Sequence, residues 1–227
     1  VRAGVPTFIA FTAQRSNFRE FPAVARLGRR VGVARVWADR VVPSGQARAR
    51  SDEVLSPEET REFVSLMRAE SRRRGLRRSP LTLHRALQFT ADGRCPYRCA
   101  AGRTLLTVLP NGDVCPCRRM PIVVGNLHDT PLASLFASSP VLRRLRDHGR
   151  ASRGCERCFY SETCGGGLRC LAYAVHGDPF RADPGCWLAG ARGEPLSSPE
   201  RRVPAQPVVP IEALLGRSHA PDRSTAG

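Results

Sequence analysis

The stretch "CERCFYSETCGGGLRC" (residues 155–170) decides how this sequence is interpreted, because it places four cysteines within sixteen residues. The chain has nine cysteines in all, and every one of them lies between residues 95 and 186. Thiols this close together are typical of a disulfide framework, a zinc site or an iron–sulfur cluster. The cysteines therefore belong to one module, and its chemistry is one of these three.

The number and spacing of the cysteines favour iron–sulfur clusters. Disulfides are disfavoured by the odd count, the chain length and the lack of a secretory signal. Zinc is a stronger alternative than disulfides, since Cys155-x2-Cys158 has the spacing of a metal-binding knuckle and Cys95-x3-Cys99 offers a second pair. However, the two pairs lack the symmetric spacing that is usual in zinc ribbons. Two four-iron clusters would use eight thiols, and residues 165–167, all glycine, suit backbone that approaches a bulky inorganic core.

The first ninety residues alternate between strand-like and helix-like segments. Thr7–Ala13 and Val33–Pro43 are short apolar runs typical of buried parallel strands. A helix is expected between them, with Asn17 as its N-cap and Gly32 as its end. Residues 56–75 predict a second helix. This order implies a parallel sheet and an α/β fold.

The second helix carries the clearest local signals of this region. Ser56 and Glu59 form a capping-box pattern, Pro57 occupies the first helical position, and Gly75 marks the end. Two strand–helix units leave one edge of a parallel sheet unpaired. Since the sequence opens on Val1 without an initiating Met, we expect these residues to be the last part of a larger barrel or sheet.

From about residue 81 the sequence becomes rich in glycines, cysteines and predicted turns. Residues 104–117 predict a hairpin with "PNGD" as its turn, and residues 130–147 predict a helical stretch. Residues 191–227 are rich in Pro and Arg without any sustained period, and we expect them to form a disordered tail. We therefore expect a small α+β cysteine-rich domain after the α/β part.

The charge of the chain is strongly positive, at +16, and all 36 basic residues are arginine. Because a surface adapted to phosphate normally mixes Lys with Arg, a high-GC gene explains this composition better than a nucleic-acid partner. No apolar run approaches the roughly 20 residues that a membrane span needs. We expect a cytoplasmic protein that binds neither nucleic acid nor membranes.

The cysteine-rich part resembles a known domain. Cys99-x12-Gly112-x4-Cys117, then Cys155-x2-Cys158-x5-Cys164, the glycine run and the trailing "GDPFRADPGC" (residues 177–186) occur together. In this order they resemble the SPASM auxiliary-cluster domain of radical S-adenosylmethionine enzymes. The resemblance covers about residues 90 to 190.

The resemblance implies a fold and a domain division. In that family the SPASM domain follows a partial (βα)6 barrel, and residues 11–17 and 36–45 resemble the last two barrel strands. The implied division is residues 1–88 as the end of the barrel, 89–190 as the SPASM domain and 191–227 as the tail.

The resemblance also implies two 4Fe-4S auxiliary clusters and their ligands. One cluster would take Cys95, Cys99, Cys117 and Cys170, and the other would take Cys155, Cys158, Cys164 and Cys186. Cys115 is left as the spare thiol. The sequence departs from the family pattern in two places. The fourth cysteine of the run is expected at position 168, where Leu168 stands, and Arg118 replaces the acidic base of sulfatase-maturing relatives.

One absence limits the implied function. The CxxxCxxC loop that binds the catalytic cluster and S-adenosylmethionine does not occur in this sequence, so this chain alone is not expected to start the radical reaction. S-adenosylmethionine and a third 4Fe-4S cluster are implied only for a full-length form. The leading hypothesis is the auxiliary-cluster portion of an enzyme that modifies a peptide or protein, with a redox donor protein as partner. The alternatives are a non-catalytic iron–sulfur electron carrier or peptide-binding module, and a structural zinc protein.

Overall fold

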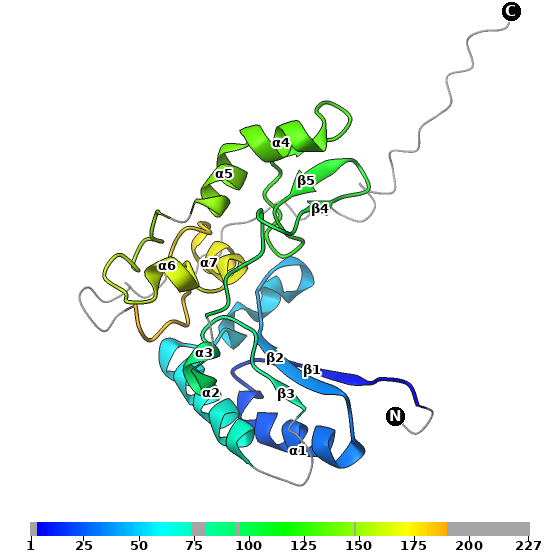
Figure 1. The fold of residues 1–227 in the computed structure, drawn as a ribbon, viewed down its shortest axis with the longest axis vertical. Coiled ribbons are helices and arrows are strands. Elements are labelled where there is room, and N and C mark those ends of the chain that lie inside the picture. The colour runs from blue at the N-terminus through cyan, green and yellow to red at the C-terminus, as the bar shows by residue number, and fades with distance from the viewer. Residues whose placement is uncertain (1–3, 74–79, 94–95, 148, 190–227) are drawn as a thin grey trace, which may run out of the picture.

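The structure is a computed structural model, and it describes residues 4–73, 80–93, 96–147 and 149–189 of the chain. These residues contain two three-stranded sheets, one parallel and one antiparallel. Figure 1 shows the parallel sheet with the helices α1 and α2 at one end of the molecule, and the antiparallel sheet with α4 and α5 at the other. The chain therefore has a mixed α/β fold, as the sequence predicts.

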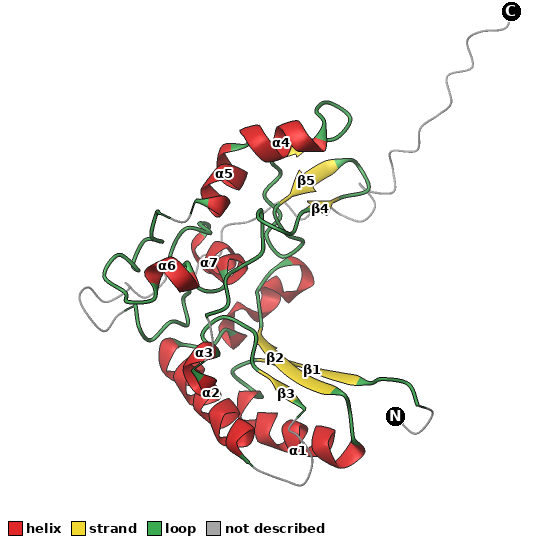
Figure 2. Cartoon of the chain, viewed as in Figure 1, coloured by secondary structure: helices red, strands yellow, loops and turns green. Residues whose placement is uncertain are grey.

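Figure 2 shows the helices in red and the strands in yellow. The strands are β1 (Phe8–Ala13), β2 (Arg35–Arg40), β3 (Leu81–Thr82), β4 (Thr107–Val108), β5 (Asp113–Cys115) and β6 (Gly125–Asn126). The α-helices are α1 (Phe21–Val31), α2 (Pro57–Arg72), α3 (Phe89–Asp92), α4 (Leu132–Ser138), α5 (Pro140–Arg146), α6 (Ser161–Cys164) and α7 (Arg169–His176). Two 3-10 helices are η1 (Phe18–Glu20) and η2 (Gly45–Glu53).

The parallel sheet has the order β1-β2-β3, with β2 in the centre. The prediction of a buried strand is confirmed for β2, where four of six residues are buried. It is wrong in part for β1, where Phe8 is 55% exposed and every second residue faces solvent. The physical reason is that no element among the described residues covers the sheet face opposite α1 and α2, toward which the exposed residues of β1 point.

The helix α1 begins later than the sequence predicts. Asn17 does not cap it; its side-chain Oδ1 accepts a hydrogen bond from the backbone N–H of Gln14 at 2.8 Å instead. The turn η1 follows, and α1 starts at Phe21 with a proline in its first turn. Its predicted end is confirmed, because Gly32 adopts the left-handed φ of 78° that favours glycine.

The capping box of α2 is confirmed. The Ser56 hydroxyl accepts a hydrogen bond from the Glu59 backbone at 3.1 Å, and the Glu59 carboxylate accepts one from the Ser56 backbone at 2.8 Å. These two bonds satisfy two of the free N–H groups that every helix start leaves. Gly75, the predicted end of this helix, lies outside the described residues.

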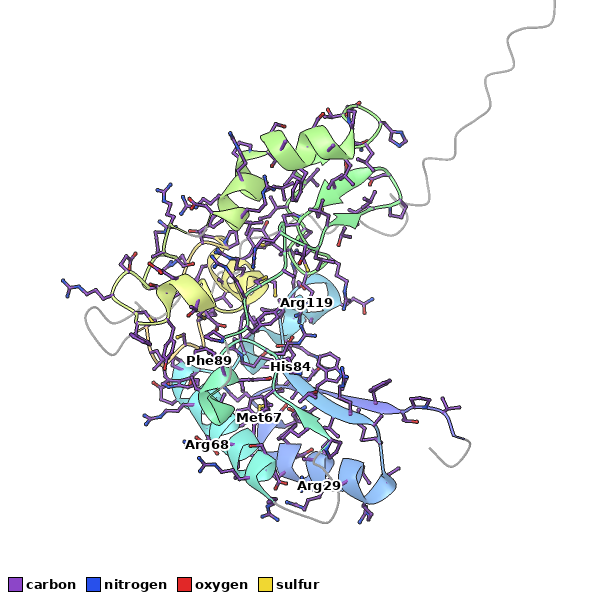
Figure 3. All side chains as sticks on the ribbon, viewed as in Figure 1. Arg29, Met67, Arg68, His84, Phe89 and Arg119 are labelled. Atoms are coloured by element: carbon purple, nitrogen blue, oxygen red, sulfur yellow. The ribbon has the colours of Figure 1, made fainter. Side chains whose placement is uncertain are left out.

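The core of the α/β part lies between the sheet and its two helices. Phe21 of α1 and Phe63 of α2 pack edge to face at 5.6 Å between ring centroids, and Phe11 of β1 contacts both rings. Met67 is fully buried beside them and is labelled in Figure 3. Trp187, next to Cys186, also packs on this core, so the end of the cysteine-rich part is fixed to the parallel sheet.

Gly28 shows how closely α1 approaches β2. A Cβ at this position would lie 2.4 Å from Cγ2 of Val36, a β-branched side chain that is fully buried. We expect Gly28→Ala to lower the free energy of unfolding by about 1–2 kcal/mol, because overpacking outweighs the helix propensity that alanine adds. Urea unfolding followed by circular dichroism measures this. Gly149→Ala is the matched control, since a Cβ there meets only Asp147 Oδ1 at 3.7 Å, and an equal loss in both variants would contradict the packing argument.

The antiparallel sheet confirms the predicted hairpin. The strands β4 and β5 pair around the "PNGD" turn, where the Gly112 N–H donates to the Leu109 carbonyl at 2.9 Å, and β6 pairs with β5. The predicted helical stretch over residues 130–147 is two helices, α4 and α5. They separate at Ser139, because the residue before Pro140 is driven out of the helical conformation.

Two further predictions concern the predicted tail and membrane spans. Residues 191–227, which the sequence predicts to be a tail, lie outside the described residues. Within the ranges that the structure describes, no helix is both long enough and apolar enough to cross a membrane.

Candidate metal centres

Four of the predicted ligands line one cavity. Cys155, Cys158, Cys164 and Cys186 surround it together with Gly166. We call these four cysteines the second thiol group. Short turns place them: the Cys158 N–H donates to the Cys155 carbonyl at 3.0 Å, and Cys164 ends the helix α6. The structure thus brings together residues that are up to 31 positions apart in the sequence, 155 to 186.

Burial and mutual proximity raise the pKa values of Cys155, Cys164 and Cys186. Burial is the largest cause at Cys155, and together with the neighbouring Cys186, Cys158 and Cys164 it raises the pKa of Cys155 to about 12. Burial likewise raises the pKa of Cys186 to about 11, and it raises the pKa of Cys164. Buried thiols with such pKa values hold their protons at neutral pH. A metal that binds them as thiolates must therefore displace those protons.

Backbone N–H groups converge on the sulfurs. The N–H groups of Gly166 and Gly167 bond to Cys164 and lower its pKa against the larger effect of burial, and those of Leu188 and Ala189 do the same at Cys186. Such donors stabilise sulfur that carries negative charge. This supports the interpretation of the glycine run as backbone that approaches the sulfurs.

The glycine run also makes contacts that a larger residue would prevent. Gly165, Gly166 and Gly167 all have positive φ, between 66° and 92°. A Cβ on Gly166 would lie 2.3 Å from the Ser152 hydroxyl, and one on Gly167 would lie 2.6 Å from Cβ of Asp183. Glycine is therefore required here both by conformation and by space.

A second set of cysteines gathers around α7. Cys99, Cys117 and Cys170, with Cys95 as the predicted fourth member, form what we call the first thiol group. Burial is the largest cause that raises the pKa of Cys170 to about 12, and Cys99 and Cys117 are among the neighbours that contribute to this value. Burial also raises the pKa of Cys99, which Cys117 raises further. Cys95 itself lies outside the described residues.

The predicted spare thiol, Cys115, lies close to Cys117 of this set. It is buried in β5, where burial raises its pKa and Asp113 and Cys117 raise it further. Cys117 is a neighbour of Cys99 and Cys170 as well as of Cys115. The choice of Cys117 over Cys115 as the ligand stays a prediction.

Four thiols line the cavity of the second thiol group. Four thiolates are the ligand set of a four-iron cluster, and tetrahedral zinc takes four as well. Among the described residues, no group of three or more His, Cys, Asp or Glu side chains is arranged to hold one metal ion.

A buried ion pair joins the second thiol group to the parallel sheet. Arg40, at the end of β2, donates to both carboxylate oxygens of Asp183, at 2.8 and 2.5 Å, and the two side chains are 5% and 1% exposed. Asp183 also accepts hydrogen bonds at 2.9 Å from the N–H groups of Leu168 and Gly185. It therefore links β2, the glycine run and the loop that carries Cys186.

The two charged residues at the end of β2, Asp39 and Arg40, have different partners. Successive residues of a strand face opposite sides, so their side chains part. Arg40 binds Asp183, while Asp39 accepts a hydrogen bond from Arg119 at 2.9 Å. Figure 3 shows Arg119 where the parallel sheet meets the cysteine-rich part.

Sequence reasoning missed this link because its partners are 143 positions apart. The only local signal is that Asp183 belongs to the "GDPFRADPGC" segment. A second missed residue is Arg169, which is buried and interacts electrostatically with both Cys99 and Cys155. Its positive charge lies within reach of both thiol groups and opposes the negative charge that thiolates bring.

Known proteins share parts of this sequence. Residues 99–159 match the model of the SPASM family, described as an iron–sulfur cluster-binding domain. The chain is 27% identical over 192 residues to the PqqA peptide cyclase of Gluconobacter oxydans, covering 82% of this chain and 52% of the relative. It is 25% identical over 207 residues to the AdoMet-dependent heme synthase of Nitratidesulfovibrio vulgaris, covering 81% and 54%.

A solved structure shares the fold. The crystal structure of Streptococcus suis SuiB bound to S-adenosylmethionine superposes with a TM-score of 0.55 at 14% identity, covering 82% of this chain and 46% of that one. The chain spans about half the length of the curated relatives that it matches. Together these matches confirm the resemblance to radical S-adenosylmethionine enzymes with a SPASM domain.

Proposed function

We propose that this chain is the auxiliary-cluster part of a radical S-adenosylmethionine enzyme that modifies a peptide. The observation that carries the proposal is the cavity shared by Cys155, Cys158, Cys164 and Cys186 within a chain that matches the SPASM family. The similarity to PqqA peptide cyclases supports a peptide as the substrate class. The proposed division is residues 1–88 as the end of a partial barrel and 89–190 as the SPASM domain.

The residues present suit two four-iron clusters. The second thiol group would hold one, and Cys99, Cys117, Cys170 and the predicted Cys95 would hold the other. Bound there, four-iron clusters supply one-electron transfer or a contact to substrate. The chain's own residues bury the thiols, aim backbone N–H groups at the sulfurs and fix the loop of Cys186 through Asp183.

The parallel sheet supports the barrel part of the proposal. The helices α1 and α2 pack on one face of the sheet, toward which Val36 and Ala38 point. Trp37 and Asp39 alternate with them and face the other way. In a barrel this second face is the interior, and Asp39 stands at the carboxyl end of its strand, where barrel enzymes hold their chemistry.

The experiment that tests the activity uses the protein encoded by the whole gene, reconstituted with iron and sulfide without oxygen. We expect it to contain a CxxxCxxC loop and to release 5'-deoxyadenosine from S-adenosylmethionine under dithionite. Replacement of the first cysteine of that loop should abolish the release. A protein with full iron content and no 5'-deoxyadenosine would instead favour the alternative, a non-catalytic electron carrier or peptide-binding module.

A further inference from the structure

An open hollow of about 590 Å³ lies apart from the cavity of the second thiol group. It is formed by α5, by the loop that leads to Cys155 and by the segment that follows α7. The side chains that matter for its chemistry are Arg144, Arg150, Arg153, Glu156, Asp178 and Phe180. Its volume falls in the range of sites that bind small molecules or short peptide segments.

The two carboxylates of the hollow already have partners. Asp178 forms an ion pair with Arg153 and accepts a hydrogen bond from the Phe180 N–H at 2.8 Å. Glu156 accepts a hydrogen bond from the Gly154 N–H at 2.9 Å. Two acids therefore face three arginines, Arg144, Arg150 and Arg153, and the hollow keeps a net positive charge.

Arg150 has no carboxylate partner within the described part of the chain, and Arg144 has only the electrostatic attraction of Asp178, which already forms an ion pair with Arg153. The Arg144 guanidinium lies over the Phe180 ring at 4.5 Å, which holds it in place without neutralising it. Arg150 is exposed at the rim of the hollow. Two fixed or accessible guanidinium groups beside an aromatic ring provide paired donors for carboxylates and an apolar surface between them.

We propose that this hollow binds an acidic segment of a peptide through Arg144 and Arg150. The inference rests on the proposed function and deepens it, because it names the chemistry of the peptide. Carboxylates spaced along a peptide can reach the two arginines while avoiding Glu156 and Asp178. A dense polyanion such as nucleic acid would meet those two acids, so the site favours a peptide.

The hollow lies next to the loop that carries Cys155. Arg153 and Glu156 flank Cys155, so one wall of the hollow belongs to the loop that carries a thiol of the second group. An acidic segment held there is anchored beside that group and limits where the rest of the peptide can reach. The hollow therefore selects peptides by the charge of a segment that is separate from the segment of the peptide that reacts.

The test is binding of a fluorescein-labelled octapeptide of alternating glutamate and alanine to the reconstituted chain, followed by fluorescence anisotropy. We expect Arg150→Ala and Arg144→Ala each to weaken binding roughly tenfold, because each removes a charge-assisted hydrogen bond. The matched control is the double variant Arg61→Ala and Arg68→Ala, which removes two exposed arginines from α2 and should change binding less than about twofold. A peptide of glutamine and alanine should not bind.

Several results would overturn the inference. They are no binding, an equal loss in the α2 control, or displacement by an oligonucleotide whose own binding depends on Arg144 and Arg150. Arg150 is exposed, so its variant remains informative if Arg144→Ala fails to fold. Iron content of the same samples separates the two proposals. Clusters without peptide binding would contradict this inference alone. Peptide binding without clusters would contradict the proposed function.

Discussion

Cys155→Ala is expected to lower the iron content of the reconstituted chain from about eight atoms to about four, with an equal loss of sulfide. Cys155 lines the cavity of the second thiol group, and its pKa responds to all three other members, so it occupies a central place among them. Removing it leaves three thiolates for one cluster while the first thiol group is untouched. Iron and acid-labile sulfide analysis under anaerobic conditions measures the change.

The matched control for this variant is Cys115→Ala. Cys115 is also buried and lies in the same module, but it is assigned to neither group. Its variant should keep about eight iron atoms. The assignment of ligands is wrong if Cys115→Ala loses iron and Cys155→Ala does not.

Asp183→Ala is expected to cost about 3–5 kcal/mol of stability, because it leaves the Arg40 guanidinium buried without its counter-ion. It also removes the acceptor for the N–H groups of Leu168 and Gly185. The midpoint of thermal unfolding should fall by roughly 10 °C for a chain of this size. Differential scanning fluorimetry of the reconstituted protein, at equal iron loading, measures the shift.

Two further variants isolate the ion pair. Asp178→Ala breaks the exposed pair with Arg153 and should cost no more than about 1 kcal/mol. Combining Arg40→Leu with Asp183→Leu removes both charges and should recover part of the loss, since no unpaired buried charge remains. Equal costs for Asp183→Ala and Asp178→Ala would show that burial of the Arg40 pair does not matter.

Much of the fold could be predicted from local patterns. The order of strands and helices, the capping box at Ser56 and Glu59, the turn after Leu109 and the end of α1 at Gly32 all depend on residues near one another in the sequence. The start of α1 could not be predicted from local patterns, because the Asn17 side chain accepts a hydrogen bond from the Gln14 backbone and the turn η1 lies before the helix.

The grouping of the cysteines came from the family resemblance, and the structure brings seven of the eight expected ligands into two neighbourhoods; Cys95 lies outside the described residues. Spacing alone could not have paired Cys170 with Cys99, since the neighbouring run would assign it to the other group. The link between Arg40 and Asp183 was also beyond local reasoning. It depends on the docking of the cysteine-rich part against β2, which no short-range pattern encodes.

The most direct test of the account is the metal and sulfide content of the anaerobically reconstituted chain, together with its visible and electron paramagnetic resonance spectra. Two four-iron clusters predict about eight iron atoms and about eight sulfides per chain, with the spectra of cubane clusters. Zinc in stoichiometric amounts, with no acid-labile sulfide, would contradict the account and leave a structural zinc protein.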